Sequence, residues 1–494
     1  MAKLTDLPAE LLIRIIHHVL YPKGYGFPYH EHHFLDHTQI SRSSPPKPRP
    51  HRERIVIRRP VISQQSPRPY YGQVSWPEGL PENPLLPLSL VNPTFRQCAQ
   101  ELLFSNVALP SKWTAMLFLR SLTSVPPHDD PSLHARQNDD THLQAMQAPR
   151  PSGLSRHVRS LQFSWGLECS MGQGGGSMFC DIIHSCPLLE NIAISNTFLL
   201  ACKEPILDAL ASKTLIKELV VHQNTSGEGS TFQWQAHEVL SRLFLHWNSL
   251  ETVEFFKLSG WPIDSLEPAP TSIPTLNCAI RTMILNNHDL DEHALSTLLK
   301  SCGESMRKLK ITGPNYRLDR AALCRVLQEC TSPNLETLIL VKSYHWEDPL
   351  SSNLDSDDPL TSPGLLDIVF NSPTALKNLK TLSFRGIMAT GRLFERLPKS
   401  IIKLSWERCD LPAYSLLNAL TSRSRDGQNF LPNLECCSVH TRDRWSIKDR
   451  TALEKAFKRR GACFHIINDY SYTLPRMMGE MEGDNFSIES ADPL

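Results

Sequence analysis

The sequence contains no run of about 18 consecutive apolar residues, so it offers no candidate for a transmembrane helix. Its first residues lack a long apolar stretch followed by a cleavage site, and we expect no signal peptide. Neither sign of charge is in excess, because 51 Lys and Arg residues balance 51 Asp and Glu residues. A neutral chain creates no strong field that attracts nucleic acid or an anionic membrane. We therefore expect a soluble protein of the cytoplasm, the nucleus or both, with neither membrane nor nucleic acid as a partner.

Motifs for catalysis and metal binding are also missing. The 13 Cys residues include no C-x-x-C pair, so we interpret them as free, mostly buried thiols of a reducing compartment rather than as zinc ligands. The histidines of residues 29–37 do not follow the zincin spacing, and the glycines of residues 172–176 match no nucleotide-binding loop. No nucleophile elbow and no kinase signature occurs. The sequence therefore predicts a non-catalytic chain without catalytic residues, cofactor or metal ion.

Residues 1–20 carry the pattern of a helix. Asp6 is a suitable cap, and Pro8 fits the first turn, where its missing N–H costs nothing. The apolar residues that follow recur at helical spacing: Leu11, Leu12, Ile15, Ile16, Val19 and Leu20. Burial of each contributes about 1.5 to 3 kcal/mol, so another part of the protein must cover this stripe.

A second helical pattern covers residues 85–110. Asn92-Pro93 divides it into two short helices, because proline disfavours a helical conformation in the residue before it. Residues 21–84, between the two patterns, are rich in proline and poor in apolar residues. We interpret them as a disordered insertion.

From about residue 155 the chain repeats one pattern, apolar-x-x-apolar-x-apolar. Its ten middle positions are Leu161, Ile192, Leu219, Val253, Met283, Leu309, Leu338, Leu382, Leu404 and Cys437. They span 276 residues in nine intervals, a mean period of about 31 residues, which is slightly above the usual range of leucine-rich repeats. Between these predicted strands lie helical stretches, two of which open with an acidic residue, Asp291 and Asp319.

The repeated pattern predicts an α/β solenoid over residues 155–470, with parallel strands inside and helices outside. The polar residues 111–154 are interpreted as a linker, and the acidic residues 471–494 as a disordered tail. An acidic loop, residues 345–362, is expected to project at the longest repeat spacing. The alternative fold is a doubly wound α/β domain, which would not repeat one motif ten times.

The N-terminal helices resemble the F-box, a three-helix motif. Its opening pattern is matched by residues 7–10 (Leu-Pro-Ala-Glu), its first helix by residues 11–20, and its closing pattern by residues 88–95 (Leu-Ser-Leu-Val-Asn-Pro-Thr-Phe). Residues 102–107 resemble the end seen in fungal-type members. The sequence departs from the family in the long insertion, where other members have a short loop. The alternative interpretation is an ordinary helical cap on the repeat array.

The repeats resemble the leucine-rich repeats of F-box proteins, and the fullest match is Ile401-x-x-Leu404-x-Trp406-x-x-Cys409-x-Leu411. The joint resemblance implies the substrate-recognition subunit of an SCF-type ubiquitin ligase. In that family the F-box docks on a Skp-type adaptor and through it on a cullin scaffold, while the repeats bind a protein substrate. The competing hypothesis is a leucine-rich-repeat scaffold for protein–protein interaction without a ubiquitin-ligase role.

The matched motif positions are the predicted adaptor-binding residues: Leu7, Pro8, Leu11, Leu12, Ile15, Leu88, Leu90, Val91 and Phe95. Some of them must pack the helices together instead, and the sequence does not distinguish the two groups. The substrate and its binding residues are unknown. Several tryptophans are possible interface anchors: Trp165, Trp247, Trp261, Trp346 and Trp406.

Overall fold

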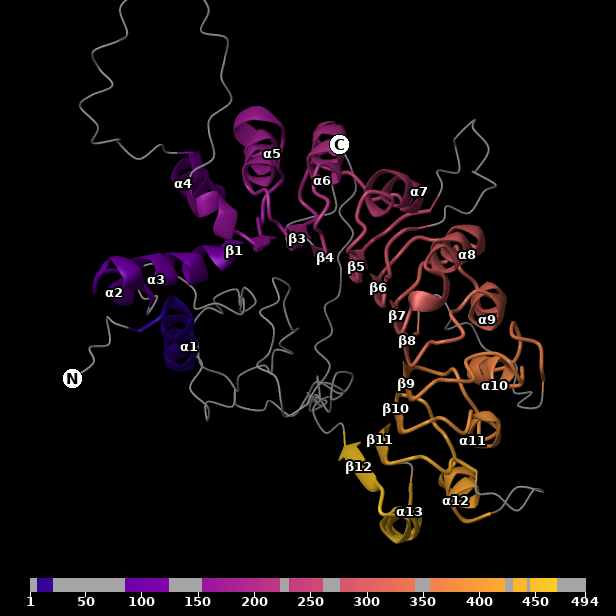
Figure 1. Ribbon diagram of the computed structural model, residues 1–494. Coiled ribbons are helices and arrows are strands. Elements are labelled where there is room, and N and C mark those ends of the chain that lie inside the picture. Colours follow the sequence, from indigo (N-terminus) through magenta and orange to yellow (C-terminus); the bar gives the residue numbers. More distant parts are fainter. Residues whose placement is uncertain are drawn as a thin grey trace, which may run out of the picture.

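A computed structural model describes residues 7–20, 85–123, 153–222, 231–260, 276–342, 356–422, 430–441 and 445–468. The elements follow one another along an open arc, with the strands on the inner side and the helices on the outer side (Figure 1). The predicted insertion, most of the predicted linker, the predicted tail and the histidines of residues 29–37 lie outside the described residues. Among the described helices, none is both long and apolar enough to cross a membrane.

The inner side of the arc is one sheet of twelve strands in sequence order, and every neighbouring pair is parallel. The strands are β1 (Asn106–Leu109), β2 (Ser160–Phe163), β3 (Asn191–Ser195), β4 (Glu218–His222), β5 (Thr252–Phe256), β6 (Thr282–Asn286), β7 (Lys308–Thr312), β8 (Thr337–Val341), β9 (Thr381–Arg385), β10 (Lys403–Glu407), β11 (Cys436–Thr441) and β12 (Cys463–Asn468).

The register of the sheet follows the repeated pattern. All ten predicted middle positions stand in one row across the sheet, from Leu161 on β2 to Cys437 on β11. Val107 on β1 and Phe464 on β12 continue this row at its two ends. Side chains alternate between the two faces of a strand, so an apolar-x-apolar pattern places both apolar residues on the helix side.

Helices return the chain from strand to strand, except between β5 and β6, where residues 261–275 lie outside the described residues. They are α4 (Lys112–Thr123), α5 (Gly176–Ser185), α6 (Lys203–Ala211), α7 (Ala236–Glu238), α8 (Glu292–Ser301), α9 (Arg320–Glu329), α10 (Leu365–Val369), α11 (Leu393–Arg396), α12 (Ala413–Thr421) and α13 (Ile447–Arg460). Shorter turns are the 3-10 helices η4 (Gly153–His157), η5 (Gly172–Gly174), η6 (Leu200–Cys202) and η8 (Gly303–Ser305), and the π-helix η7 (Val239–Phe244).

Asp291 and Asp319, which precede α8 and α9, act as N-terminal caps of these helices. The side chain of Asp291 accepts a hydrogen bond from the Ala294 amide, and that of Asp319 accepts one from the Ala322 amide, both at 2.7 Å. Each bond satisfies an amide that has no partner within its own helix.

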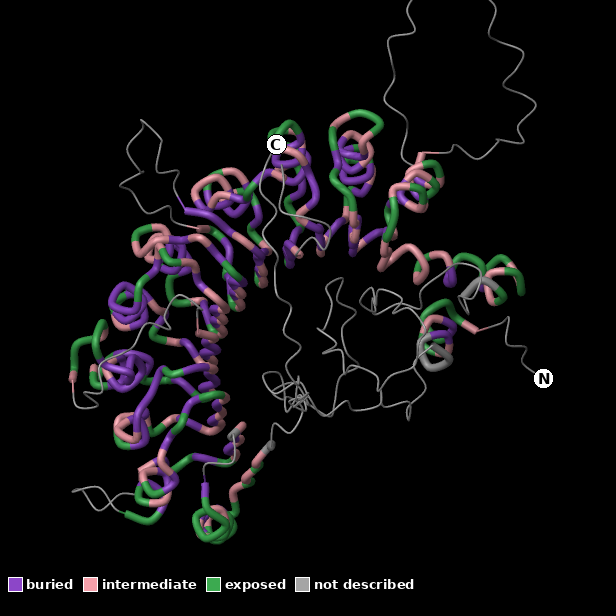
Figure 2. Tube along the Cα trace, turned by 180° about the vertical axis from the view of Figure 1, so that it is seen from behind, coloured by how far each residue is buried: buried purple, intermediate pink, exposed green. Residues whose placement is uncertain are grey.

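The buried residues form a continuous layer between the strands and the helices (Figure 2). The main core extends from Leu109 to Phe457 and includes the middle and last apolar residues of each predicted repeat. The helices that the structure describes cover one face of the sheet, whereas a doubly wound domain has helices on both faces (Figure 1). The α/β class and the solenoid-like arrangement of parallel strands inside helices are therefore confirmed.

Three helices precede the sheet: α1 (Ala9–Leu20), α2 (Leu85–Ser89) and α3 (Pro93–Ser105). They have a small core of their own, separate from the main core, built from Leu12, Ile16, Phe95, Cys98 and Ala99. The Cys98 thiol of α3 also contacts the Ala9 carbonyl at 3.9 Å. A division of residues 85–110 at Asn92-Pro93 is confirmed, because the Asn92 side chain caps α3 by accepting from the Phe95 amide at 2.8 Å.

The sheet begins earlier than the repeats predicted from the sequence. Strand β1 lies within residues 85–110, and α4 lies within the residues interpreted as a linker. Phe104-x-x-Val107-x-Leu109 has the repeat pattern, but these residues also continue the helical pattern before them. Of the expected acidic loop, only residues 356–362 are described; several of them are exposed, and the loop's end is held at α9, where Arg320 donates to the Ser362 carbonyl at 2.8 Å.

Candidate functional site

The predicted adaptor-binding residues divide into two groups in the structure. Leu12 on α1 and Phe95 on α3 are 0% and 3% exposed and form the centre of the small helical core. Leu7 and Leu88 are partly buried and pack against that core. These four side chains hold the three helices together, and the fully buried Leu12 and Phe95 cannot contact a partner without unfolding the unit.

The other group remains accessible. Leu90 is 78% exposed, Val91 56% and Leu11 42%, Pro8 is exposed as well, and Ile15 is intermediate. Pro8 and Leu11 lie at the start of α1, whereas Leu90 and Val91 lie in the turn between α2 and α3. Each is available to a partner, because contact of an apolar side chain with water costs free energy that a partner can recover. We call Pro8, Leu11, Leu90 and Val91 the apolar surface.

Main-chain hydrogen bonds fix the turn that presents Leu90 and Val91. The Leu90 amide donates to the Pro87 carbonyl at 3.1 Å, and the Val91 amide donates to the Leu88 carbonyl at 3.2 Å. The Asn92 cap then starts α3 directly after this turn. The two side chains are therefore held in water by backbone geometry rather than by contacts of their own, so a partner meets a surface that is already ordered.

The inner face of the sheet is the second candidate surface. Residues between the core positions of each strand point to this face, and their chemistry changes along the arc. The partly exposed Glu254 on β5 is followed by the partly exposed Lys308 and Lys310 on β7, whereas Glu218 on β4 is buried at 8%. A surface that carries both signs of charge fits a protein partner with complementary charges rather than a polyanion.

Beyond β7, hydroxyl groups and one ion pair line the inner face. Ser383 and Ser405 share a hydrogen bond of 2.7 Å, and Arg385 pairs with Glu407 at 3.1 Å, each linking β9 to β10. These side chains hold one another across neighbouring strands. Ser383 is buried, whereas Ser405, Arg385 and Glu407 remain partly exposed and accessible to a partner.

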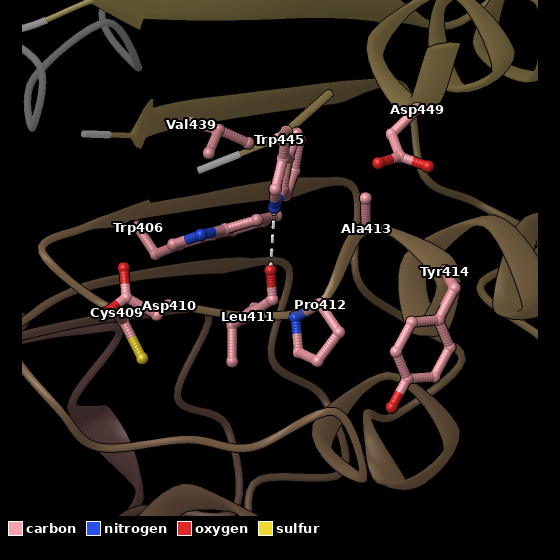
Figure 3. A pocket seen from close by; sticks show the side chains of 10 residues that line it. All are labelled: Trp406, Cys409, Asp410, Leu411, Pro412, Ala413, Tyr414, Val439, Trp445 and Asp449. Carbon is pink, nitrogen blue, oxygen red and sulfur yellow. Dashed lines mark hydrogen bonds between the residues drawn. The ribbon is translucent and has the colours of Figure 1, made fainter. Parts of the chain in front are cut away.

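A cavity of about 310 Å³ lies between α12 and α13 at the far end of the arc (Figure 3). Trp406 and Trp445 form its aromatic wall, and the Trp445 indole N–H donates to the Leu411 carbonyl at 2.9 Å. Asp449 lies at its edge, but its carboxylate already accepts from the Ser446 hydroxyl at 2.8 Å as part of the α13 cap.

The three tryptophans that the structure describes among the possible anchors are core residues. Trp165, Trp247 and Trp406 are 2%, 0% and 1% exposed, so none can anchor a partner. Trp261 and Trp346 lie outside the described residues. The structure instead exposes Trp113, at 64%, on α4, where the sequence predicted a linker.

Two buried ionisable side chains, His288 and Asp367, form hydrogen bonds inside the repeats. His288 occupies the position that Cys409 has in another repeat, and complete burial lowers its pKa to about 3, so it is neutral. Its Nδ1 accepts from the Leu290 amide at 3.3 Å. Burial raises the pKa of Asp367 to about 6, although Thr390 donates to that carboxylate from its amide and its hydroxyl.

Burial also shifts the pKa of the thiols, and it raises the pKa of Cys180 and of Cys324 to about 11. Both are protonated near neutral pH, and a thiol is a weak nucleophile in that form. The described cysteines contain no disulfide, as expected for free thiols.

Comparison with known proteins identifies no relative. No family model matches the chain, and no curated protein matches it.

Proposed function

We propose that this chain is the substrate-recognition subunit of an SCF-type ubiquitin ligase. The three N-terminal helices would act as an F-box that docks on a Skp-type adaptor and through it on a cullin. The strands and helices that follow would act as leucine-rich repeats whose inner face binds a protein substrate. The chain itself would be non-catalytic, and its work would be in the cytoplasm, the nucleus or both.

The observation that carries this proposal is the apolar surface. Motif residues Pro8, Leu11, Leu90 and Val91 remain exposed, while their neighbours in the same motif build a core separate from that of the sheet. A helical unit that only capped the sheet would be expected to direct such side chains into the main core. The separate core and the exposed residues favour a unit with a binding role of its own.

The inner face supports the second half of the proposal. A curved parallel sheet offers a long concave surface, and parallel strands expose side chains at regular spacing without loops. Such a receptor contributes by holding the substrate close to the enzyme that transfers ubiquitin, which raises the local concentration of substrate lysines there.

Adaptor binding is the decisive test. The full chain is co-expressed with a Skp-type adaptor, and binding is compared for wild type and for Leu90→Asp with Val91→Asp. Burial of either carboxylate in an apolar interface is costly, so we expect the double variant to lose the adaptor. A matched control is Ile447→Asp on α13, an apolar residue that is 82% exposed at the other end of the arc.

Retention of the adaptor by the double variant, or loss by the control as well, would contradict a role for the apolar surface. Absence of binding by the wild-type chain would favour the competing proposal of a repeat scaffold without a ubiquitin-ligase role. The inner face would remain the candidate binding surface in that case.

A further inference from the structure

Three side chains with metal-binding chemistry meet at the last two strands. Cys436 begins β11 and stands opposite Cys463, which begins β12. His465 is two residues beyond Cys463, so its side chain projects from the same face of β12. The two thiol sulfurs and one imidazole nitrogen all lie within 4.8 Å of one another.

This spacing fits a thiophilic ion. A tetrahedral zinc ion binds thiolate at about 2.3 Å and imidazole at about 2.0 Å, which places two sulfurs about 3.8 Å apart. Closing the cluster from its present spacing requires movements of about an ångström. Strand β12 can supply them because it is the last strand of the sheet and has a neighbour on one side only among the described strands.

The charges also match. Two thiolates and a neutral imidazole balance a divalent cation, so the complex adds no net charge beside Lys403, the next residue of this row on β10.

We propose that Cys436, Cys463 and His465 bind a zinc ion on the inner face of the sheet. Three protein ligands leave the fourth position open to water or to a group of a partner. The ion would add a side-chain link between the edge strand β12 and β11, which already pair along six residues. Cys463 and His465 are exposed and Cys436 is partly exposed, so an ion can enter from solvent.

The experiment uses the full chain without a polyhistidine tag, kept reduced with a phosphine. Co²⁺ serves as a spectroscopic probe, because thiolate ligation gives a charge-transfer band that carboxylate or imidazole ligation lacks. Zn²⁺ affinity is measured by competition with a chromogenic chelator. We expect the wild type to show the thiolate band and to bind one equivalent of Zn²⁺ more than Cys436→Ser with Cys463→Ser.

Two controls separate this cluster from other ligands. His440→Ala removes a histidine of β11 outside the cluster and should leave the band unchanged, whereas His465→Ala should shift it and weaken Zn²⁺ binding. Replacement of the histidines within residues 29–37 by alanine should preserve the thiolate band. Thermal unfolding with a chelator present should show that the serine variant is folded like the metal-free wild type.

Absence of a thiolate band in the reduced wild type, or its persistence in the double serine variant, would overturn the proposal. The outcome is independent of adaptor binding, because the cluster and the apolar surface lie at opposite ends of the arc (Figure 1).

Discussion

The role of Leu90 and Val91 can be expressed as a binding free energy. Full burial of one such side chain contributes about 1.5 to 3 kcal/mol. Leu90 is 78% exposed and Val91 56%, so these fractions are what a partner can still cover. Truncation of both to alanine should therefore remove about 2 to 4 kcal/mol of binding to a Skp-type adaptor, a loss of about 30-fold to 1,000-fold in affinity.

The same truncation should leave the free chain stable. The turn at these residues is held by the amides of Leu90 and Val91, which alanine retains. Substitution of side chains that are already in water changes stability by about 0.5 kcal/mol or less. Phe95→Ala is the opposite case, because it opens a cavity in the small helical core at a cost of about 3 to 5 kcal/mol.

Isothermal calorimetry with the adaptor and thermal unfolding of the free chain measure the two quantities separately. An unchanged dissociation constant for the double alanine variant would refute the assignment. A fall in the melting temperature of the free double alanine variant that accompanies its loss of affinity would also refute the assignment, because the two residues would then act by stabilising the helices.

Two further predictions concern buried ionisable side chains in the repeats. Burial holds the pKa of His288 near 3, whereas the unfolded chain takes up this proton near pH 6.5, so stability falls as the pH drops between these values. The free energy of unfolding should fall by about 2 kcal/mol between pH 7.5 and 5 in the wild type, and this fall should be absent in His288→Asn. Urea unfolding at both pH values measures it, and an equal fall in the two proteins would refute the prediction. Arg320 is 5% exposed and donates to the carbonyls of Pro359, Ser362, Pro363 and Ile387. Arg320→Met should therefore lower the free energy of unfolding by about 2 to 5 kcal/mol and speed proteolysis near residue 360. Arg325→Met on the same helix breaks only an exposed pair with Glu292, and cleavage as fast as in the Arg320 variant would contradict the argument.

The sheet could be predicted closely because one physical rule repeats along the chain. Each predicted middle position is apolar and lies two residues before another apolar position, which is the pattern of a strand with one buried face. Neighbouring strands then align their equivalent residues, as Leu309 and Leu338 do. Strand β12 was missed because Gly461 stands where the pattern requires an apolar residue.

The candidate surface could be predicted as a set of residues but not sorted. Leu11 and Leu12 are chemically identical neighbours, yet one is 42% exposed and the other 0%. Their difference arises from the direction in which α1 meets α3, a tertiary contact between segments far apart in the sequence. The cluster of Cys436, Cys463 and His465 could not be predicted for the same reason, since only the pairing of β11 with β12 brings its cysteines together.

Helix α3 ends at Ser105 and β1 begins at Asn106, so no linker separates the helices from the sheet. The same helix contributes Phe95 to the small core and Phe104 to the edge of the main one, where Phe104 stacks on Phe118 at 5.8 Å. Ser105 also accepts a hydrogen bond from the Arg159 amide at 3.1 Å. Because no residues separate the two elements, α3 fixes the angle between the N-terminal helices and the sheet. In the proposed function, the distance between the adaptor and the bound substrate would then depend on the number of repeats. Adding or deleting one repeat would shift the substrate by a fixed distance.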